Sequence, residues 1–172
     1  MTRKADFNAE EWSTVVDGPL YAGMRVISAD RGGTVRETLA MSRVYKAARE
    51  HHGESELLDE LMKSPPSIDA DRLREAGGNI AALTSQQLRE ASRILEAKAT
   101  PSEVEAYKRF VWTVAQAVAS AHKEGGFLGV GGKQISDAEH KALDEISTAL
   151  GDPPRPETRE PTEPTEPTEP AP

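Results

Sequence analysis

Apolar residues recur every three or four positions over most of this chain, which is the spacing of helices with one buried face. The clearest stripe lies within residues 101–123, where four valines and a tyrosine share one face. This stripe consists of Val104, Tyr107, Val111, Val114 and Val118. Strands with one exposed face alternate apolar and polar residues, and the sequence lacks that alternation. The pattern therefore predicts an all-α fold.

The same spacing predicts a single bundle of six or seven helices over residues 7–151. Their expected ranges are 9–16, 19–29, 34–51, 54–62, 84–98, 101–123 and 137–150, with room for a helical turn at 69–75. The break after residue 16 rests on Asp17-Gly18-Pro19, because proline is costly inside a helix but tolerated in its first turn. The core must be built mainly from Ala, Val, Leu and Ile, since only 5% of the residues are aromatic.

Helix starts are marked by a repeated capping pattern, in which an Asn, Ser or Thr is followed three residues later by Glu or Gln. The first side chain satisfies a free backbone N–H, and the second reaches back to the cap residue. The pairs are Asn8 with Glu11, Thr34 with Glu37, Thr84 with Gln87, Thr100 with Glu103, and Ser136 with Glu139.

The two ends of the chain differ in composition from the middle. Residues 1–6 are expected to be a flexible N-terminus. Residues 152–172 are rich in Pro, Thr and Glu, with Thr-Glu-Pro repeated at 162–164, 165–167 and 168–170. Such a segment cannot bury enough apolar surface to fold, so we expect a disordered acidic tail with polyproline character.

Net charge and composition limit which partners and which cellular compartment we expect. The formal net charge is −8 and no basic stripe offsets it, which argues against a nucleic-acid partner. There is no cysteine, which fits a reducing compartment. No run approaches the roughly 18 apolar residues of a membrane span, and the N-terminus has no apolar run typical of a secretory signal. We therefore expect a cytoplasmic protein without a transmembrane segment.

Two glycine-rich turns that lead into capped helices are the main candidates for chemistry. One spans residues 27–37 and the other spans residues 129–139. In the first, Asp30 lies in the turn and Glu37 in the first turn of the next helix, so their carboxylates could supply oxygen ligands to Mg²⁺ or Ca²⁺. The alternative is that Asp30 belongs to an ordinary helix end and Glu37 is only the reciprocal cap.

The first turn also resembles the TerB-like family of bacterial tellurite-resistance and stress-response proteins. In that family an apolar helix ends in Ala-Asp, a glycine turn and a small β-branched residue follow, and a Glu lies in the next helix. The matching positions are Ala29, Asp30, Gly32 or Gly33, Val35 and Glu37. The resemblance implies an all-helical domain that binds a divalent cation through acidic side chains and has no known catalysis. Asp30 and Glu37 would be the main ligands, with Glu139 in the second turn as a further one.

No catalytic pattern stands out in the sequence, so we expect a protein that is not an enzyme. It has no Gly-x-Ser-x-Gly elbow, no phosphate loop ending in Lys-Ser/Thr, and no histidine with Glu three residues upstream. The alternative to cation binding is a metal-free helical module for protein–protein interaction with a disordered tether. Its partner would bind through a groove of the bundle, the Phe127–Val130 loop or the tail.

Overall fold

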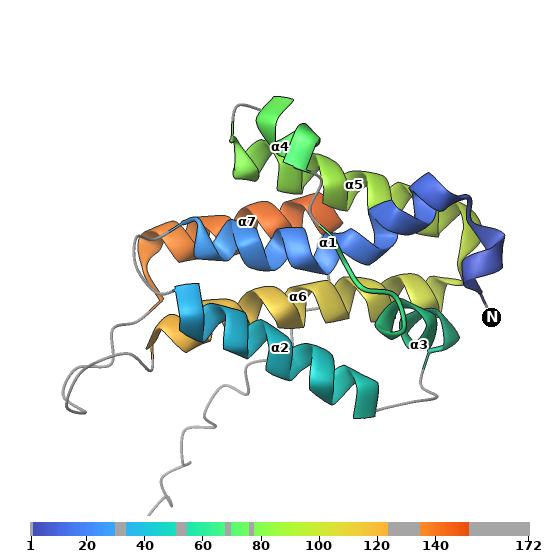
Figure 1. Cartoon of the computed structure of the whole chain (residues 1–172), viewed down its shortest axis with the longest axis horizontal. Coiled ribbons are helices and arrows are strands. Elements are labelled where there is room, and N and C mark those ends of the chain that lie inside the picture. The colour runs from blue at the N-terminus through green and yellow to red at the C-terminus, as the bar shows by residue number, and fades with distance from the viewer. Residues whose placement is uncertain are drawn as a thin grey trace, which may run out of the picture.

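Two long helices, residues 9–27 and 101–123, lie side by side at the centre of the molecule in the computed structural model (Figure 1). The structure describes residues 2–29, 34–50, 55–67, 70–75, 78–123 and 135–151. These residues form a short 3-10 helix, Lys4–Asp6, and seven α-helices: α1 (Ala9–Ile27), α2 (Thr34–Glu50), α3 (Glu56–Met62), α4 (Ala70–Glu75), α5 (Ile80–Lys98), α6 (Pro101–Lys123) and α7 (Asp137–Leu150). The all-α prediction is confirmed, while the predicted tail at 152–172 lies outside the described residues.

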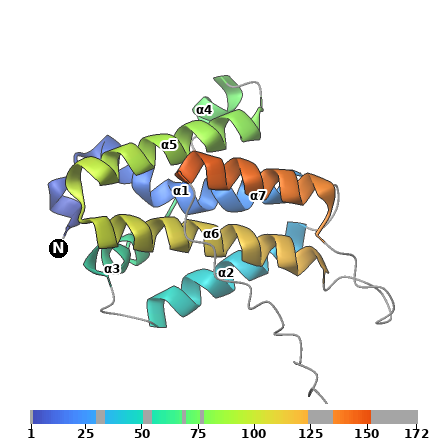
Figure 2. The same ribbon diagram turned by 180° about the vertical axis from the view of Figure 1, so that it is seen from behind.

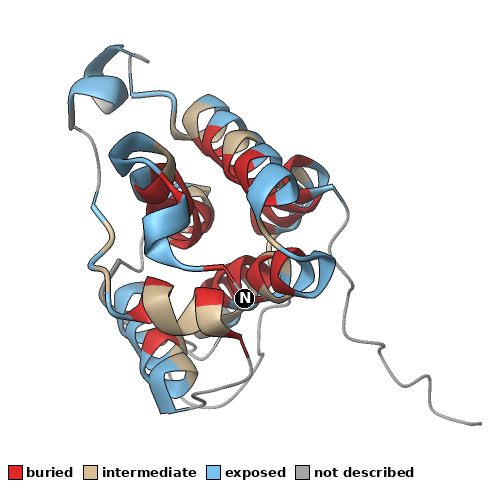
Figure 3. Ribbon diagram, turned by 90° about the vertical axis from the view of Figure 1, so that its right-hand side faces the viewer, coloured by how far each residue is buried: buried red, intermediate tan, exposed pale blue. Residues whose placement is uncertain are grey.

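Helix α6 is the central element of the core. It packs against α1, α2, α3 and α7, and α5 covers α1 and α7 (Figures 1 and 2). The predicted seam of α6 is buried, with Tyr107, Val111, Val114 and Val118 all fully enclosed. The view along the bundle shows buried residues facing inward on every long helix (Figure 3). No helix in the described part of the chain is both long and apolar enough to cross a membrane.

The capping pattern identifies three helix starts correctly. At α1 the Glu11 N–H donates to Asn8 at 2.9 Å, and the Asn8 N–H donates to the Glu11 carboxylate at 2.8 Å. Thr100 with Glu103 and Ser136 with Glu139 make the same reciprocal bonds at α6 and α7. The side chains of Thr34 and Glu37 lie outside the described residues.

The predicted break at 17–19 is wrong, because α1 continues through Pro19 from Ala9 to Ile27. A proline inside a helix has no N–H for the carbonyl four residues earlier, which here belongs to Val15. The Tyr107 hydroxyl of α6 donates to that carbonyl oxygen at 2.9 Å. A tertiary hydrogen bond therefore replaces the missing helical one, and the helix does not need to end.

Gly18 makes room for this replacement. A Cβ atom at position 18 would collide with the Tyr107 hydroxyl oxygen and would lie 3.4 Å from Leu88 Cδ2. Any larger residue would push the tyrosine away from the Val15 carbonyl. The Gly18-Pro19 pair, which suggests a turn in the sequence, is thus the contact point at which α1 and α6 approach closely.

The predicted helix start at Thr84 and Gln87 is also wrong. Helix α5 begins at Ile80, and Asn79 caps it by accepting a hydrogen bond from the Ala82 N–H at 3.1 Å. Thr84 and Gln87 instead face α1 from inside α5. The Thr84 hydroxyl donates to the Tyr21 carbonyl oxygen at 3.1 Å, and the Gln87 amide donates to the Thr14 carbonyl oxygen at 3.0 Å. Their three-residue spacing reflects a shared helix face and not a cap.

Thr2 docks onto the start of α6. Thr2 is buried, and its N–H and hydroxyl each donate to the Glu103 carboxylate at 2.8 Å. Burial alone raises the pKa of Glu103, but the hydrogen bonds from Thr2 and Thr100 outweigh it and lower that pKa to about 2. The ionised Glu103 therefore caps its own helix and also holds Thr2 in place.

Replacing Gly18 by Ala should destabilise the protein, although alanine is the better helix former by about 1 kcal/mol. The new methyl group displaces the Tyr107 hydroxyl, and we expect a net loss of about 1–3 kcal/mol in urea unfolding. Gly23→Ala is the matched control on the same helix, because its Cβ would lie 2.7 Å from the flexible Met41 Sδ. A smaller loss at position 18 than at position 23 would contradict the proposed packing.

Glu103→Gln should destabilise the protein at neutral pH by about 3 kcal/mol, the value implied by lowering the pKa from 4.5 to about 2. The contribution of a carboxyl group with a lowered pKa is present above its unfolded pKa. It is lost as the pH falls from about 4.5 toward 2. Urea unfolding of both proteins at pH 7 and pH 3 should therefore show a smaller difference at pH 3. A difference that does not change with pH would contradict this account.

Candidate functional site

The helix ends that adjoin the two glycine turns lie at one end of the bundle. The last turn of α1, the first turn of α2, the last turn of α6 and the first turn of α7 all lie at the same end, in both views (Figures 1 and 2). Ala29, in the first glycine-turn segment, and Ile135, in the second, both pack against the core. An ion pair between Arg25 of α1 and Glu145 of α7, 2.9 Å apart, also ties the helices near this end.

Glu139 is the predicted ligand whose surroundings the structure describes. It is 3% exposed and lies in the first turn of α7. Its Oε2 atom accepts a hydrogen bond from the Ser136 N–H at 2.8 Å, and its own N–H donates to the Ser136 hydroxyl at 3.2 Å. The residue therefore has the capping role, while its second role as a metal ligand stays a prediction.

The other two predicted ligands lie beyond what the structure describes. Asp30 is outside the described residues, and Glu37 belongs to α2 with a side chain that is not described. Within the described ranges, no three His, Cys, Asp or Glu side chains gather in a way that could hold a metal ion. Glu139 thus has no partner ligands among these side chains, and a metal site here depends on residues 30–37 and 124–134. The Phe127–Val130 loop is among these residues and is not described either.

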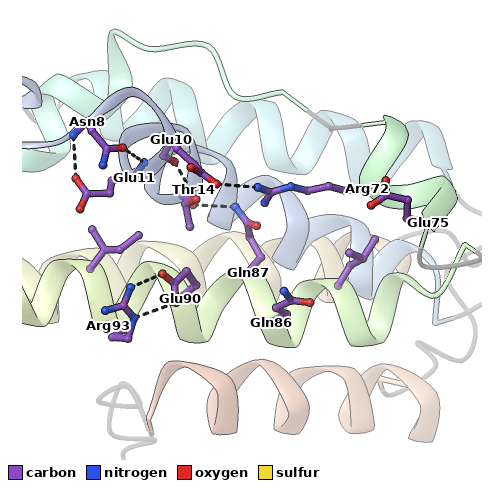
Figure 4. A pocket seen from close by; sticks show the side chains of 12 residues that line it. Asn8, Glu10, Glu11, Thr14, Arg72, Glu75, Gln86, Gln87, Glu90 and Arg93 are labelled. Carbon is purple, nitrogen blue, oxygen red and sulfur yellow. Dashed lines mark hydrogen bonds and ion pairs between the residues drawn. The ribbon is translucent and has the colours of Figure 1, made fainter.

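A groove that sequence analysis did not identify runs between the N-terminal half of α1, α4 and α5 (Figure 4). Its volume is about 720 Å³. Most of the side chains that line it are charged or carry an amide. They are Asn8, Glu10, Glu11, Thr14, Arg72, Glu75, Leu83, Gln86, Gln87, Glu90, Arg93 and Ile94. The groove is therefore suited to a ligand that forms ion pairs and hydrogen bonds, and less suited to an apolar ligand.

Ion pairs organise the walls of the groove. Arg93 holds both oxygens of Glu90, at 2.5 and 3.0 Å, and this pairing lowers the pKa of Glu90. Arg72 of α4 lies 3.6 Å from Glu10 of α1 and so spans the opening (Figure 4). These pairs are exposed and contribute little to stability, so a ligand can exchange partners with them at small cost.

A smaller cleft of about 300 Å³ continues from the groove toward the middle of α1. Asp17 lies there and is 7% exposed. Its Oδ2 atom accepts from the Ser13 hydroxyl at 2.9 Å, and its Oδ1 atom accepts from the Ser67 N–H at 2.7 Å. Burial is the main reason why the pKa of Tyr45 is raised, and the negative charge of Asp17 raises that pKa further. The Asp17 carboxylate thus lines the cleft and also raises the pKa of a tyrosine in the core.

A signal for this site is present in the sequence but is easily missed. Glu10, Ser13 or Thr14, and Asp17 recur at three- and four-residue intervals along α1, which gives the helix a polar stripe beside its apolar one. The expected helix break after residue 16 separates Asp17 from the rest of this stripe. Residues 67 and 72 reach the stripe only through tertiary folding, so no local pattern places them there.

Comparison of the chain with protein-family models, curated proteins and solved structures finds no match.

Proposed function

We propose that this chain is a non-enzymatic, TerB-like helical module that binds a divalent cation, Mg²⁺ or Ca²⁺, in the bacterial cytoplasm as part of a stress response. Asp30, Glu37 and Glu139 are the proposed ligands. The observation that carries the proposal is that the helix ends flanking both glycine turns lie at one end of the bundle (Figures 1 and 2). Segments about a hundred positions apart in the sequence are therefore brought to one end of the fold.

The chemistry of Glu139 is compatible with this role. Its capping bond uses Oε2, whereas no described residue donates a hydrogen bond to Oε1. A carboxylate whose one oxygen is fixed by a backbone N–H presents the other in a defined direction, as hydrogen-bonded ligating carboxylates do. The turns would supply the remaining oxygen atoms, since Mg²⁺ and Ca²⁺ take six or more.

Thermal unfolding of the full chain tests the proposal. After chelation, titration with Mg²⁺ or Ca²⁺ should raise the melting temperature by several degrees at a hundred times the dissociation constant, where binding adds about 2.7 kcal/mol. Asp30→Asn or Glu37→Gln should abolish this rise. Glu139→Gln should reduce it while leaving the melting temperature without cation almost unchanged. Glutamine also completes a capping box, and Glu139 accepts only the Ser136 N–H among the described residues, whereas Glu103 also accepts two hydrogen bonds from Thr2.

Glu105→Gln is the matched control, since Glu105 is an exposed acid of α6 without an ion pair to the rest of the described chain. It should keep the full cation response. A melting temperature that does not respond to millimolar Mg²⁺ or Ca²⁺ would overturn the proposal. That result would favour the metal-free alternative, in which a protein partner binds through the groove, the Phe127–Val130 loop or the tail.

A further inference from the structure

The cleft at Asp17 is continuous with the groove. Glu10, Thr14, Arg72 and Gln87 line both hollows, so a ligand in the groove has a path to the Asp17 carboxylate. This path lies between α1 and α5, next to α4 (Figure 4). It opens on the part of α1 before Pro19, away from the helix ends that flank the glycine turns.

Asp17 has no positively charged partner among the described residues. Among the described residues its carboxylate accepts hydrogen bonds only from Ser13 and Ser67, and no lysine or arginine forms an ion pair with it. Lys4 and Lys63 line a different hollow on which Asp17 also borders, and Lys63 Nζ pairs with Glu60 at 2.9 Å. A buried carboxylate without a counter-charge costs stability, so its presence calls for a ligand or another compensating role.

Apart from Arg72, which forms an ion pair with Glu10, the cleft offers several groups that can accept a hydrogen bond. Gln87 is 7% exposed, and its amide nitrogen donates to the Thr14 carbonyl, which leaves its Oε1 atom without a donor among the described residues (Figure 4). The Ser13 hydroxyl, which donates to Asp17, keeps its lone pairs. At the mouth, Glu10 adds a second carboxylate and Arg72 adds a guanidinium group, and these two form an ion pair at 3.6 Å. Asp17 is then the charged group of the cleft for which the described residues supply no ion pair. The cleft is therefore complementary to a group that is positive and has several donors.

We propose that this cleft binds a primary ammonium group, with Asp17 as its counter-ion. An ammonium group is a compact charge with three donors, which suits a carboxylate that has a hydroxyl and an amide oxygen as neighbouring acceptors. A guanidinium group is a poorer fit, because it pairs best with two carboxylate oxygens side by side, and each oxygen of Asp17 already accepts another bond. A free amine and a lysine side chain of a partner share this chemistry.

Calorimetric titration of the full chain at pH 7 tests the proposal and separates the two sources. The probes are n-butylamine and the peptide acetyl-Ala-Lys-Ala-amide. Their neutral controls are 1-butanol and the same peptide with norleucine in place of lysine. Saturable binding of either ammonium probe, without binding of its control, supports the proposal. Binding of the amine alone identifies a free amine, and binding of the peptide alone identifies a lysine side chain. If neither n-butylamine nor the lysine peptide binds at millimolar concentration, the proposal is overturned.

Asp17→Asn is the decisive variant because it removes the charge and keeps the size. Loss of one partner of a buried ion pair should weaken binding by roughly 30-fold or more. The melting temperature of the free variant should not fall, since Asn removes an uncompensated charge. Glu90→Gln is the control, because Glu90 lines the groove but not the cleft, and it should bind normally. Equal affinity of Asp17→Asn and the unmodified protein would overturn the proposal.

Amide NMR of the unmodified protein gives a second measurement that does not depend on a variant. The backbone N–H of Ser67 and the side-chain amide of Gln87 should shift on titration with n-butylamine, because the first donates to Asp17 and the second lines the cleft. A titration that leaves both groups unchanged would place the amine elsewhere and overturn the assignment.

Discussion

The hydrogen bond from the Tyr107 hydroxyl to the Val15 carbonyl is the interaction on which the arrangement of the central helices depends. Pro19 removes the backbone donor that Val15 would have had, and an unpaired buried carbonyl costs about 1–3 kcal/mol. The tyrosine is fully buried and satisfies it from the neighbouring helix. The register of α6 against α1 is thereby fixed at one point, with Gly18 allowing the contact.

Further polar contacts extend along α1 on both sides of that point. Thr84 and Gln87 of α5 donate to the Tyr21 and Thr14 carbonyls, and Asp17 accepts from the backbone of the segment before α4. Hydrogen bonds of this kind are directional, so they fix how neighbouring elements approach α1 better than small apolar side chains do. The same contacts shape the groove and the cleft, which is why the candidate ammonium site lies where the fold is held together.

Much of the fold is predictable from the sequence because helix periodicity and caps are local properties. The bounds of α6 and α7 and the caps at Asn8, Thr100 and Ser136 follow from neighbouring residues alone. The errors at Pro19 and at Thr84 have one common cause. In both cases a residue that is typical of a helix boundary lies next to a hydrogen bond between two helices. Neighbouring residues in the sequence do not reveal such a contact.

The two candidate sites also differ in how far they can be predicted from neighbouring residues in the sequence. The glycine turns are recognisable as local motifs, and Glu139 lies in the first turn of α7 as its cap pattern requires. The cleft combines the polar stripe of α1 with Ser67, Arg72 and Gln87 from three other parts of the chain. Only the stripe is visible in the sequence. That Asp17 is buried, with no ion pair to any described lysine or arginine, appears only in the folded structure.

A double-mutant cycle in urea unfolding, with Pro19→Ala, Tyr107→Phe and the combined variant, tests the central role of this hydrogen bond most directly. Tyr107→Phe should cost about 1–3 kcal/mol in the unmodified protein, because it leaves the Val15 carbonyl unpaired. The loss should be clearly smaller in the Pro19→Ala background, since an alanine at that position has an N–H that can donate to the Val15 carbonyl. An equal loss in both backgrounds, with no coupling between the two positions, would contradict the account.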